Sequence, residues 1–304
     1  MTSLPINQLL LRNPEIINDQ LLVVNPPQDQ GLLQLIKPHN SQLINFDARI
    51  HQACEKLGLR TEFGLPSEHS FESALLYWPK SKSFSSSLFR WLASQIKQPT
   101  KVFVLAANDA GGKSLNNSLK PFGEEITKLD VARKCSLWSF MLTPVDDFSW
   151  EKECSSFTYD NLDNDALEFA TYPGVFNAGK LDVGTQLLLD NIILNKRGRV
   201  LDLACGSGVI GLTCKSRQPE LYVEMVDIDG MALVSAEKNT KELGFDCPVF
   251  ASDGLSNTKK FNTIICNPPF HQGKDTDYNF AQQLIRTAKQ HLLPRGEVWI
   301  VANR

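Results

Sequence analysis

Short runs of apolar and β-branched residues recur along this chain of 304 residues, and most of them stop at an acidic residue, a glycine or a proline. In the second half, such runs lie at 199–203, 221–226 and 261–266, with helical segments between them. Strand-like runs that alternate with helical segments are typical of parallel sheets covered by helices. The pattern therefore predicts an α/β fold.

The first half of the chain repeats this order. Strand-like runs at 21–24, 42–46, 73–77 and 101–107 are separated by helical segments at 50–58 and 86–96. We therefore predict a tandem duplication with domains at 1–158 and 159–304, and a polar, turn-prone stretch at 160–165 near their junction. The alternative is that any two α/β domains share such an alternation.

Four residues directly after the run at 261–266 are candidates for chemistry: Asn267, Pro268, Pro269 and Phe270. The prolines end the strand because they lack an N–H group, and an asparagine at this end faces the crevice where open α/β sheets bind ligands. The Asn267 and Pro268 carbonyls can accept both hydrogens of an exocyclic amine, while Phe270 can stack on the ring. This arrangement suits an amine facing an electrophilic methyl group; an ordinary turn is the alternative.

A glycine-rich turn follows the strand run at 199–203. Gly206 and Gly208 permit tight turning and close approach of a ligand, and the helix that follows offers unpaired N–H groups. Asp202 lies inside the strand end, where it can hold an ammonium group. Asp227 and Asp253 end the next two runs and suit a ribose diol and an adenine amino group. Each acid alone is also explained as a cap or a solvated turn.

With these motifs, residues 172–303 resemble the class I S-adenosylmethionine-dependent methyltransferases. The segments 173–176 and 181–184, the glycine turn, and Asn267 to His271 resemble more narrowly the bacterial ribosomal RNA guanine-N2 methyltransferases of the RsmC type. The resemblance extends into the first half through 76–80 and 128–135.

The resemblance implies two tandem Rossmann-like methyltransferase domains, the first degenerate, with S-adenosyl-L-methionine as the cofactor and no metal. It implies methylation of the exocyclic N2 amine of a guanine in 16S ribosomal RNA, with RNA in the small ribosomal subunit as the partner. His271 is a proton acceptor or a structural hydrogen-bonding residue. The residues assigned to catalysis are Asn267, Pro268, Pro269 and Phe270, and those assigned to the cofactor are Asp202, Gly206, Gly208, Asp227, Asp253 and Asn267.

Other functions remain open at this point. The same loop suits a different amine or amide acceptor, such as a guanine of 23S ribosomal RNA, an adenine of DNA or a protein glutamine. A non-catalytic relative that binds RNA or the ribosome is a further alternative, because the second half ends early. After its run at 101–107, the first half continues with a helix at 114–119 and strands at 126–131 and 135–142, whereas the second half stops after 296–303. We therefore expect the second domain to lack its last two strands, which leaves an unpaired sheet edge.

Charge and composition restrict the partners. The formal charge is +1 for residues 1–150 and −4 for residues 151–304, so a basic RNA-binding face must be local. Seven cysteines without a Cys-x-x-Cys pair fit neither a disulfide framework nor a zinc site. The sequence has no apolar run long enough to cross a membrane, and we expect a cytoplasmic monomer. The candidate RNA-binding cations are Lys80, Lys82, Arg90, Lys97, Lys101, Lys113 and Lys120.

Overall fold

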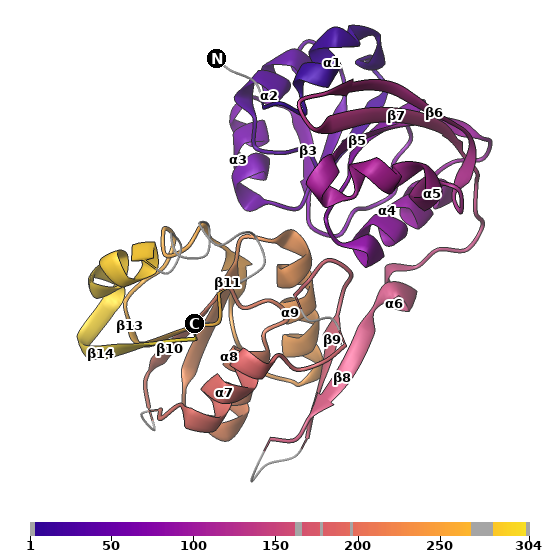
Figure 1. Ribbon diagram of the computed structural model, residues 1–304. Helices are drawn as coiled ribbons and strands as arrows, with labels where there is room; N and C mark the ends of the chain where they lie inside the picture. Colours follow the sequence, from indigo (N-terminus) through magenta and orange to yellow (C-terminus); the bar gives the residue numbers. More distant parts are fainter. Residues whose placement is uncertain (1–3, 162–165, 177–178, 195–196, 269–281, 302–304) are drawn as a thin grey trace. The chain divides into compact units, whose positions relative to one another are not determined.

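The computed structural model describes residues 4–161, 166–176, 179–194, 197–268 and 282–301 (Figure 1). The chain divides into two compact units, Met1–Glu153 and Cys154–Arg304. The second unit begins at Cys154 rather than at residue 159, because β8 (Ser155–Tyr159) pairs antiparallel with β9 (Leu167–Thr171) of the same unit.

The first unit is built on a seven-stranded sheet in the order β3-β2-β1-β4-β5-β7-β6. The first five strands are parallel, whereas β7 runs antiparallel to both β5 and β6. The strands are β1 (Leu21–Val24), β2 (Gln42–Asn45), β3 (Arg60–Phe63), β4 (Ser73–Tyr77), β5 (Thr100–Ala107), β6 (Gly123–Ala132) and β7 (Cys135–Leu142). The helices are α1 (Gln8–Arg12), α2 (Gln30–Ile36), α3 (Ala48–Lys56), α4 (Lys82–Ser94), α5 (Leu115–Leu119) and α6 (Trp150–Glu153), with 3-10 turns η1 (Pro14–Ile16), η2 (Asn108–Ala110) and η3 (Gly112–Ser114).

Side-chain caps start the main helices of this unit. Asp29 accepts from the N–H of Gly31 at 2.8 Å and thereby starts α2. Asp47 and Ser81 accept in the same way at the starts of α3 and α4. Each cap satisfies an N–H group that has no partner within the helix, so the polar residue after a strand fixes where the next helix begins.

The second unit is built on a five-stranded sheet in the order β12-β11-β10-β13-β14, in which every pairing is parallel. The chain runs from β10 to β11 on one side and later returns to β13 on the other. Such a switch point opens a crevice at the carboxyl ends of the central strands. The elements are α7 (Val183–Asn191), β10 (Arg199–Leu203), α8 (Val209–Arg217), β11 (Tyr222–Asp227), α9 (Gly230–Glu242), β12 (Val249–Ala251), β13 (Phe261–Cys266), a helical segment at 282–288, η4 (Lys289–His291) and β14 (Leu292–Ile300).

The two sheets share one strand order, with β3-β2-β1-β4-β5 matching β12-β11-β10-β13-β14. Their registers also match, because Val24 pairs with Leu76 in the first sheet as Leu203 pairs with Cys266 in the second. The predicted tandem α/β architecture is confirmed. In the described part of the second unit, β14 pairs with β13 alone, whereas β5 of the first unit also pairs with β7.

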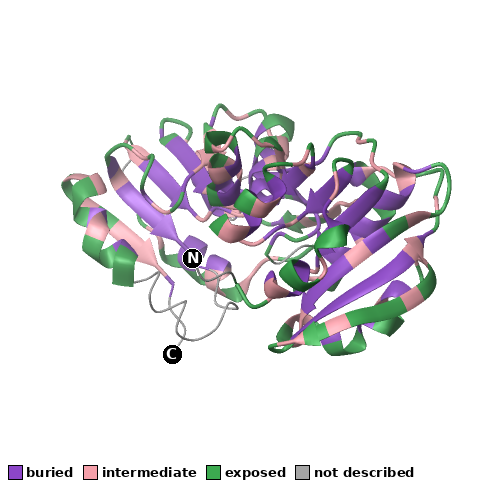
Figure 2. Ribbon diagram, turned by 90° about the horizontal axis from the view of Figure 1, so that it is seen from above, coloured by how far each residue is buried: buried purple, intermediate pink, exposed green. Residues whose placement is uncertain are grey.

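Alternate residues of β10 face opposite layers of the second unit. Val200 packs into the cluster that includes Ile210 and Leu212 of α8. Leu201 and Leu203 pack into the cluster on the other face of the sheet. In Figure 2 the central strands are buried and the helices have exposed outer surfaces, whereas the edge strands β6 and β14 are exposed or half-buried. Because side chains alternate along a strand, Asp202 shares the face of Val200 and lies under α8.

Candidate functional site

The turn between β10 and α8 has a left-handed backbone at three positions. The angle φ is +56° at Ala204, +55° at Gly206 and +82° at Gly208. A Cβ on Gly208 would lie 3.0 Å from Sδ of Met225, so this glycine allows the turn to pack against β11. A Cβ on Gly206 would meet Cγ1 of Val175 only at 3.9 Å. The positive φ therefore favours a glycine at this position, and the space beside it stays open.

Asp202 is a buried carboxylate with one oxygen left unsatisfied. Its side chain is 0% exposed, and Oδ2 accepts from the N–H of Gly211 in α8 at 2.8 Å. Oδ1 is buried without a hydrogen-bond partner. Burial raises the pKa of Asp202 to about 7, although the hydrogen bond from Gly211 opposes the shift. A cationic donor such as an ammonium group would satisfy Oδ1 and favour the ionised carboxylate.

Asp227 joins the glycine turn to the end of β11. Its Oδ2 accepts from the N–H of Gly206 at 2.9 Å, and its Oδ1 accepts from the N–H of Asp229 at 3.0 Å. Burial raises the pKa of Asp227, and these backbone hydrogen bonds oppose the rise. The N–H of Ser252 donates to the backbone oxygen of Asp227 at 2.9 Å, which brings the exposed Asp253 to the same edge of the sheet.

Asn267 follows β13 and is held by the first turn of α7. Its Nδ2 donates to Oδ2 of Asp182 at 2.8 Å and to Oγ1 of Thr185 at 2.9 Å. Its Oδ1 is buried and has no hydrogen-bond partner. Since β10 lies between β11 and β13, the structure brings Asp227, Asp202 and Asn267 to neighbouring strand ends, as the sequence predicts. Pro268 follows directly, whereas Pro269, Phe270 and His271 lie outside the described residues.

Two polar residues of α9 were missed by the sequence analysis. Asn239 donates from Nδ2 to the backbone oxygens of Ala170 and Ser207, at 2.8 and 2.9 Å, and accepts from the N–H of Ala170. Ser235 accepts from the N–H of Tyr172 at 3.1 Å. These bonds tie β9 and the glycine turn to α9. One feature of the sequence could have indicated them. Ser235 and Asn239 are four residues apart and therefore lie on one face of α9, whose neighbouring buried residues are mostly apolar.

The corresponding position in the first unit is filled by the chain itself. By register, Val23 occupies the place of Asp202 and Tyr77 occupies the place of Asn267. The hydroxyl of Tyr77 donates to Oδ1 of Asn7 at 2.7 Å, and Nδ2 of Asn7 donates to Oδ2 of Asp29 at 2.7 Å. All these side chains are buried, so at this position the first unit has neither a carboxylate in the central strand nor an unsatisfied amide after the next one.

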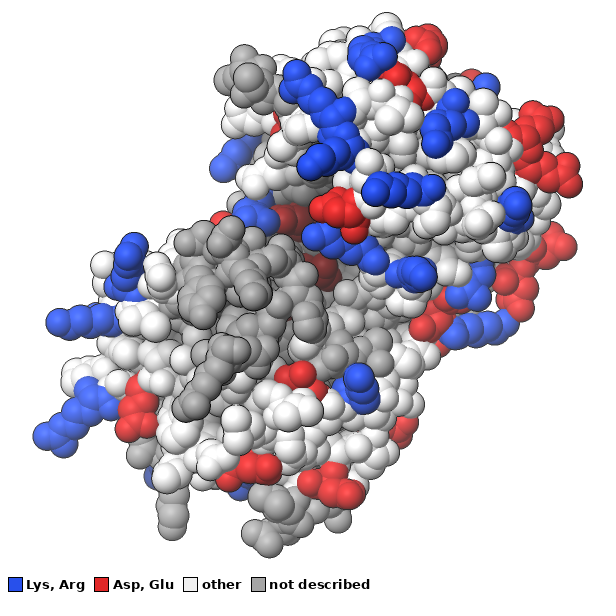
Figure 3. All heavy atoms as spheres, in the orientation of Figure 1, with Lys and Arg blue, Asp and Glu red and all other residues white. Residues whose placement is uncertain are grey.

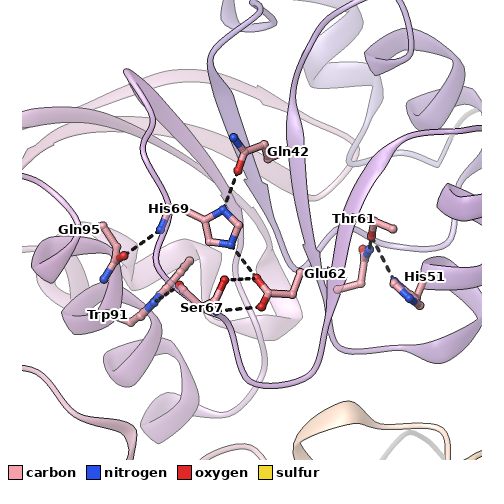
Figure 4. Close-up of polar contacts among 9 residues, drawn as sticks. Gln42, His51, Thr61, Glu62, Ser67, His69, Trp91 and Gln95 are labelled. Atoms are coloured by element: carbon pink, nitrogen blue, oxygen red, sulfur yellow. Dashed lines mark hydrogen bonds and ion pairs between the residues drawn. The ribbon is translucent and has the colours of Figure 1, made fainter.

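The first unit contains a separate polar cluster around His69 (Figure 4). The ring nitrogens of His69 lie 2.6 Å from Oε1 of Gln42 and 2.6 Å from Oε2 of Glu62. The backbone N–H of His69 donates to Oε1 of Gln95. A cavity of about 450 Å³ adjoins it, lined by Glu68, His69, Ser70, Ser94 and Gln95. Both ring nitrogens are engaged, so the cluster joins β2, β3 and α4 and offers no free base.

The described residues also bear on metal ligation, thiol reactivity and membrane spanning. No group of three or more His, Cys, Asp or Glu side chains is arranged there to hold a metal ion. Burial raises the pKa of Cys205 and Cys266 well above the ordinary range, so these thiols beside the site are poor nucleophiles. None of the described helices combines the length and apolar character needed to cross a membrane.

Comparisons with known proteins agree across both units. The family model described as "Methyltransferase small domain" matches residues 166–304, and "Methyltransferase small domain N-terminal" matches 7–156. A curated relative from Actinobacillus pleuropneumoniae serotype 7, named ribosomal RNA small subunit methyltransferase C, is 37% identical over 100% of this chain and 90% of its own length. A relative of the same name from Vibrio parahaemolyticus is 35% identical over 98% of this chain and 88% of its own length.

A solved structure shares the fold of the whole chain. The T. thermophilus 16S rRNA N2 guanine methyltransferase (RsmC), in complex with AdoMet and guanosine, superimposes with a TM-score of 0.83. The match covers 98% of this chain and 83% of that one, at 21% sequence identity. At this identity the likeness establishes the fold.

The pKa of Asp202 predicts a pH-dependent stability. The pKa is about 7 in the folded protein against 3.8 ordinarily, so between these values the folded state binds more protons at this carboxyl. The contribution of Asp202 to the free energy of unfolding is therefore greatest below the unfolded pKa and falls as pH rises through about 7. The free energy of urea unfolding should be measured from about pH 4 to about pH 8, a range that includes most of the shift. It should depend less on pH in Asp202→Asn than in the wild type.

Asp246→Asn, at an exposed position of the same unit, controls for the loss of one carboxyl group. Parallel pH profiles for Asp202→Asn and the wild type would show that Asp202 does not titrate in this window.

Proposed function

Since the chain belongs to the ribosomal RNA small subunit methyltransferase C family, we propose that it methylates the exocyclic N2 amine of a guanine in 16S ribosomal RNA, using S-adenosyl-L-methionine. Family membership rests on 35–37% identity across nearly all of the chain and most of each relative. The activity is that of a ribosomal RNA (guanine-N2)-methyltransferase.

The observation that best supports an amine acceptor is the state of the Asn267 amide. Both of its N–H groups donate to side chains of the chain itself, and only its carbonyl oxygen is left unsatisfied. A buried acceptor without a partner is unfavourable by about 1–3 kcal/mol, so the site favours a ligand that supplies an N–H group. An exocyclic amine has two such groups, one for Oδ1 and one for the Pro268 carbonyl.

The residues at the edge of the sheet fit the cofactor. Its sulfonium supplies an electrophilic methyl group when it is bound. Oδ1 of Asp202, buried and unpaired, would hold the ammonium group of the methionine portion. The open space beside Gly206, with Gly208 closing the turn, allows the backbone to approach the ligand. Asp227 retains lone pairs for the ribose diol despite its backbone hydrogen bonds.

Two further residues, Asp253 and Asn267, are assigned to the cofactor site. Asp253, exposed beyond β12, would accept from the adenine amino group. Asn267 borders the cofactor and the acceptor together, since it lies at the end of the strand next to β10.

The protein's part in the transfer is alignment and exclusion of water. Asn267 and the Pro268 carbonyl would hold the two amine hydrogens, so that electron density on the nitrogen points at the methyl carbon. Pro269, which lacks an N–H group, would leave the Pro268 carbonyl free for the acceptor, and Phe270 would stack on a base that has been drawn out of its helix. His271 would accept the proton released after attack or hold the loop by a hydrogen bond.

For the first unit we propose support of the fold and positioning of RNA. On the face of this unit that Figure 3 draws, Lys and Arg side chains are scattered rather than gathered in one block. The position of each candidate cation in the fold therefore decides which of them we assign to RNA binding. Arg90 is paired with Glu153. The register of β4 and β5 places two groups at opposite ends of the sheet: Lys80, Lys82 and Lys113 beyond the carboxyl ends, and Lys97, Lys101 and Lys120 near the start of β5.

The first of these groups is the better RNA contact. The exposed Arg133 and Lys134 in the turn between β6 and β7 lie at the same end, because the N–H of Asn108 donates to the backbone oxygen of Lys134 at 2.8 Å. The half-buried Trp78 lies at this end too and offers an aromatic surface. A site built from one unit of one chain needs no second copy, so we propose a monomer that acts in the cytoplasm on the small ribosomal subunit.

Nucleoside analysis after incubation with a labelled methyl donor tests the proposal. Small subunits or free 16S ribosomal RNA should yield N2-methylguanosine, whereas 23S ribosomal RNA, DNA and bulk protein should stay unlabelled. Label in adenine or in glutamine would overturn the guanine assignment. Asn267→Ala should lower methyl transfer by about a hundredfold or more, because the amine loses its acceptor, while cofactor affinity stays nearly intact. Asn191→Ala, at an exposed position of α7, is the matched control.

A substitution at the glycine turn should separate cofactor binding from folding. Gly206→Val places a branched side chain in the open space beside the turn and should abolish cofactor binding in calorimetry. Gly244→Val carries a comparable backbone strain, since φ is +71° there, but no atom lies within 4 Å of its Cβ. Unchanged cofactor affinity in Gly206→Val, or equal loss in both variants, would refute the role of the turn.

Salt dependence tests the RNA-binding end of the first unit. Each lysine that contacts a phosphate should lower the slope of log affinity against log salt by about one when it is removed. We expect this change in the double variant Lys80→Ala and Lys82→Ala, measured by RNA binding at several salt concentrations. The double variant Lys97→Ala and Lys101→Ala removes the same charge from the opposite end, and an equal effect there would exclude a localised contact.

A further inference from the structure

The first turn of α7 holds the amide of Asn267 in one orientation. Oδ2 of Asp182 accepts from Nδ2 of Asn267 at 2.8 Å and from the N–H of Thr185 at 3.0 Å, so one carboxylate caps α7 and contacts the site. Oγ1 of Thr185 accepts from the same Nδ2 at 2.9 Å. A Cβ on Gly184 would lie 2.9 Å from Oδ2 of Asp182 and 3.3 Å from Oδ1 of Asn267. The glycine is therefore needed for this close approach.

We propose that Asp182 and Thr185 are positioning residues that keep the carbonyl of Asn267 directed at the acceptor amine and thereby restrict the site to hydrogen-bond donors. The inference rests on the proposed function of Asn267. An amide can turn over and exchange its carbonyl for its NH2 group, and the two orientations recognise opposite partners. The orientation therefore decides whether the site accepts from an amine or donates to a ring nitrogen or a carbonyl.

Asp182 decides the orientation, and Thr185 refines the position. An ionised carboxylate only accepts hydrogen bonds, so turning the Asn267 amide over would place two acceptors against each other. A hydroxyl both donates and accepts, so Thr185 alone would tolerate either orientation. With Asp182 present, the hydroxyl hydrogen of Thr185 is directed away from Nδ2.

The carboxylate also strengthens the acceptor. A hydrogen bond from Nδ2 to a charged oxygen polarises the amide and increases the negative charge on Oδ1. The amine nitrogen becomes positively charged as the new bond forms, so Oδ1 binds the transition state more strongly than the ground state. The effect of Asp182 should thus appear mainly in kcat.

A purely structural role of Asp182 as a helix cap makes a different prediction. Asparagine is as good a cap as aspartate, so Asp182→Asn preserves the start of α7. Its NH2 group, however, can donate to the carbonyl of Asn267 and allows the amide to turn over. We expect kcat to fall by about ten- to a hundredfold, with cofactor affinity unchanged. Asp47→Asn, which alters the cap of α3 in the first unit, should leave kcat unchanged.

Thr185 supplies an independent pair of variants. Thr185→Val removes the hydroxyl at nearly constant volume and should lower kcat, while Thr185→Ser keeps the hydroxyl and should restore it. Thr240→Val is the matched control, since the Thr240 hydroxyl donates only to the backbone oxygen of Ala236 in its own helix. Equal activity of the valine and serine variants would remove Thr185 from the proposal.

A swapped pair gives the sharpest test. Asn267→Asp places two carboxylates together and should be nearly inactive, whereas adding Asp182→Asn lets the new amide donate to the new carboxylate and should recover at least about tenfold of the lost kcat. Failure of this recovery, or loss of cofactor affinity together with kcat in Asp182→Asn, would overturn the inference. If the wild type instead labels a nucleoside other than guanosine, the proposed function is wrong. The kcat values of the variants, measured with that acceptor, would still test whether Asp182 and Thr185 position Asn267.

Discussion

Hydrogen bonds from backbone N–H groups to two carboxylates hold the turn after β10, and the site depends on them. Oδ2 of Asp202 fixes the start of α8 through Gly211, and Oδ2 of Asp227 fixes the turn to β11 through Gly206. Three left-handed residues in this turn cannot be held by strand pairing, because the pairing of β10 ends at Leu203. The two carboxylates supply acceptors for backbone N–H groups there, and Oδ1 of Asp202 is left buried without a partner.

Each unit has a hydrogen-bonded pair of side chains at the same place in the fold, but the two pairs differ in whether a polar atom is left without a partner. In both units, the residue that precedes the first helix contacts a residue at the carboxyl end of the fourth strand: Asn7 contacts Tyr77, the last residue of β4, and Asp182 contacts Asn267, directly after β13. The first pair satisfies itself, since the Tyr77 hydroxyl donates to Asn7 and Asn7 donates to Asp29. The second pair leaves Oδ1 of Asn267 unsatisfied. At this position the two units therefore differ in one buried polar atom, which has a partner in the first unit and none in the second.

Local sequence was sufficient for the central strands and for the glycine turn, whereas β3, β8 and β9 were not predicted. The run before Gly206, the prolines after Asn267 and the acids at 227 and 253 act within a few residues, so sequence patterns reveal them. The hydrogen bonds of Asn267 to Asp182 and Thr185 join residues more than 80 positions apart in the chain. Hydrophobic periodicity is read over windows of roughly 11–18 residues, so it cannot reveal these contacts. Asn239 was missed for the same reason, because its partners Ala170 and Ser207 lie on other elements. The candidate lysines were found by charge, yet only the strand register separates them into two groups.

The unsatisfied atoms also determine which part of the protein a ligand stabilises. A buried acceptor without a partner costs about 1–3 kcal/mol, and both Asp202 and Asn267 carry one in the second unit. In the first unit, Val23 stands in the place of Asp202, and its buried apolar side chain has no acceptor for a cationic group. A ligand that binds only the folded state raises stability in proportion to the logarithm of its concentration. We propose that this gain belongs to the second unit, where a bound ligand would supply partners for Oδ1 of Asp202 and Oδ1 of Asn267.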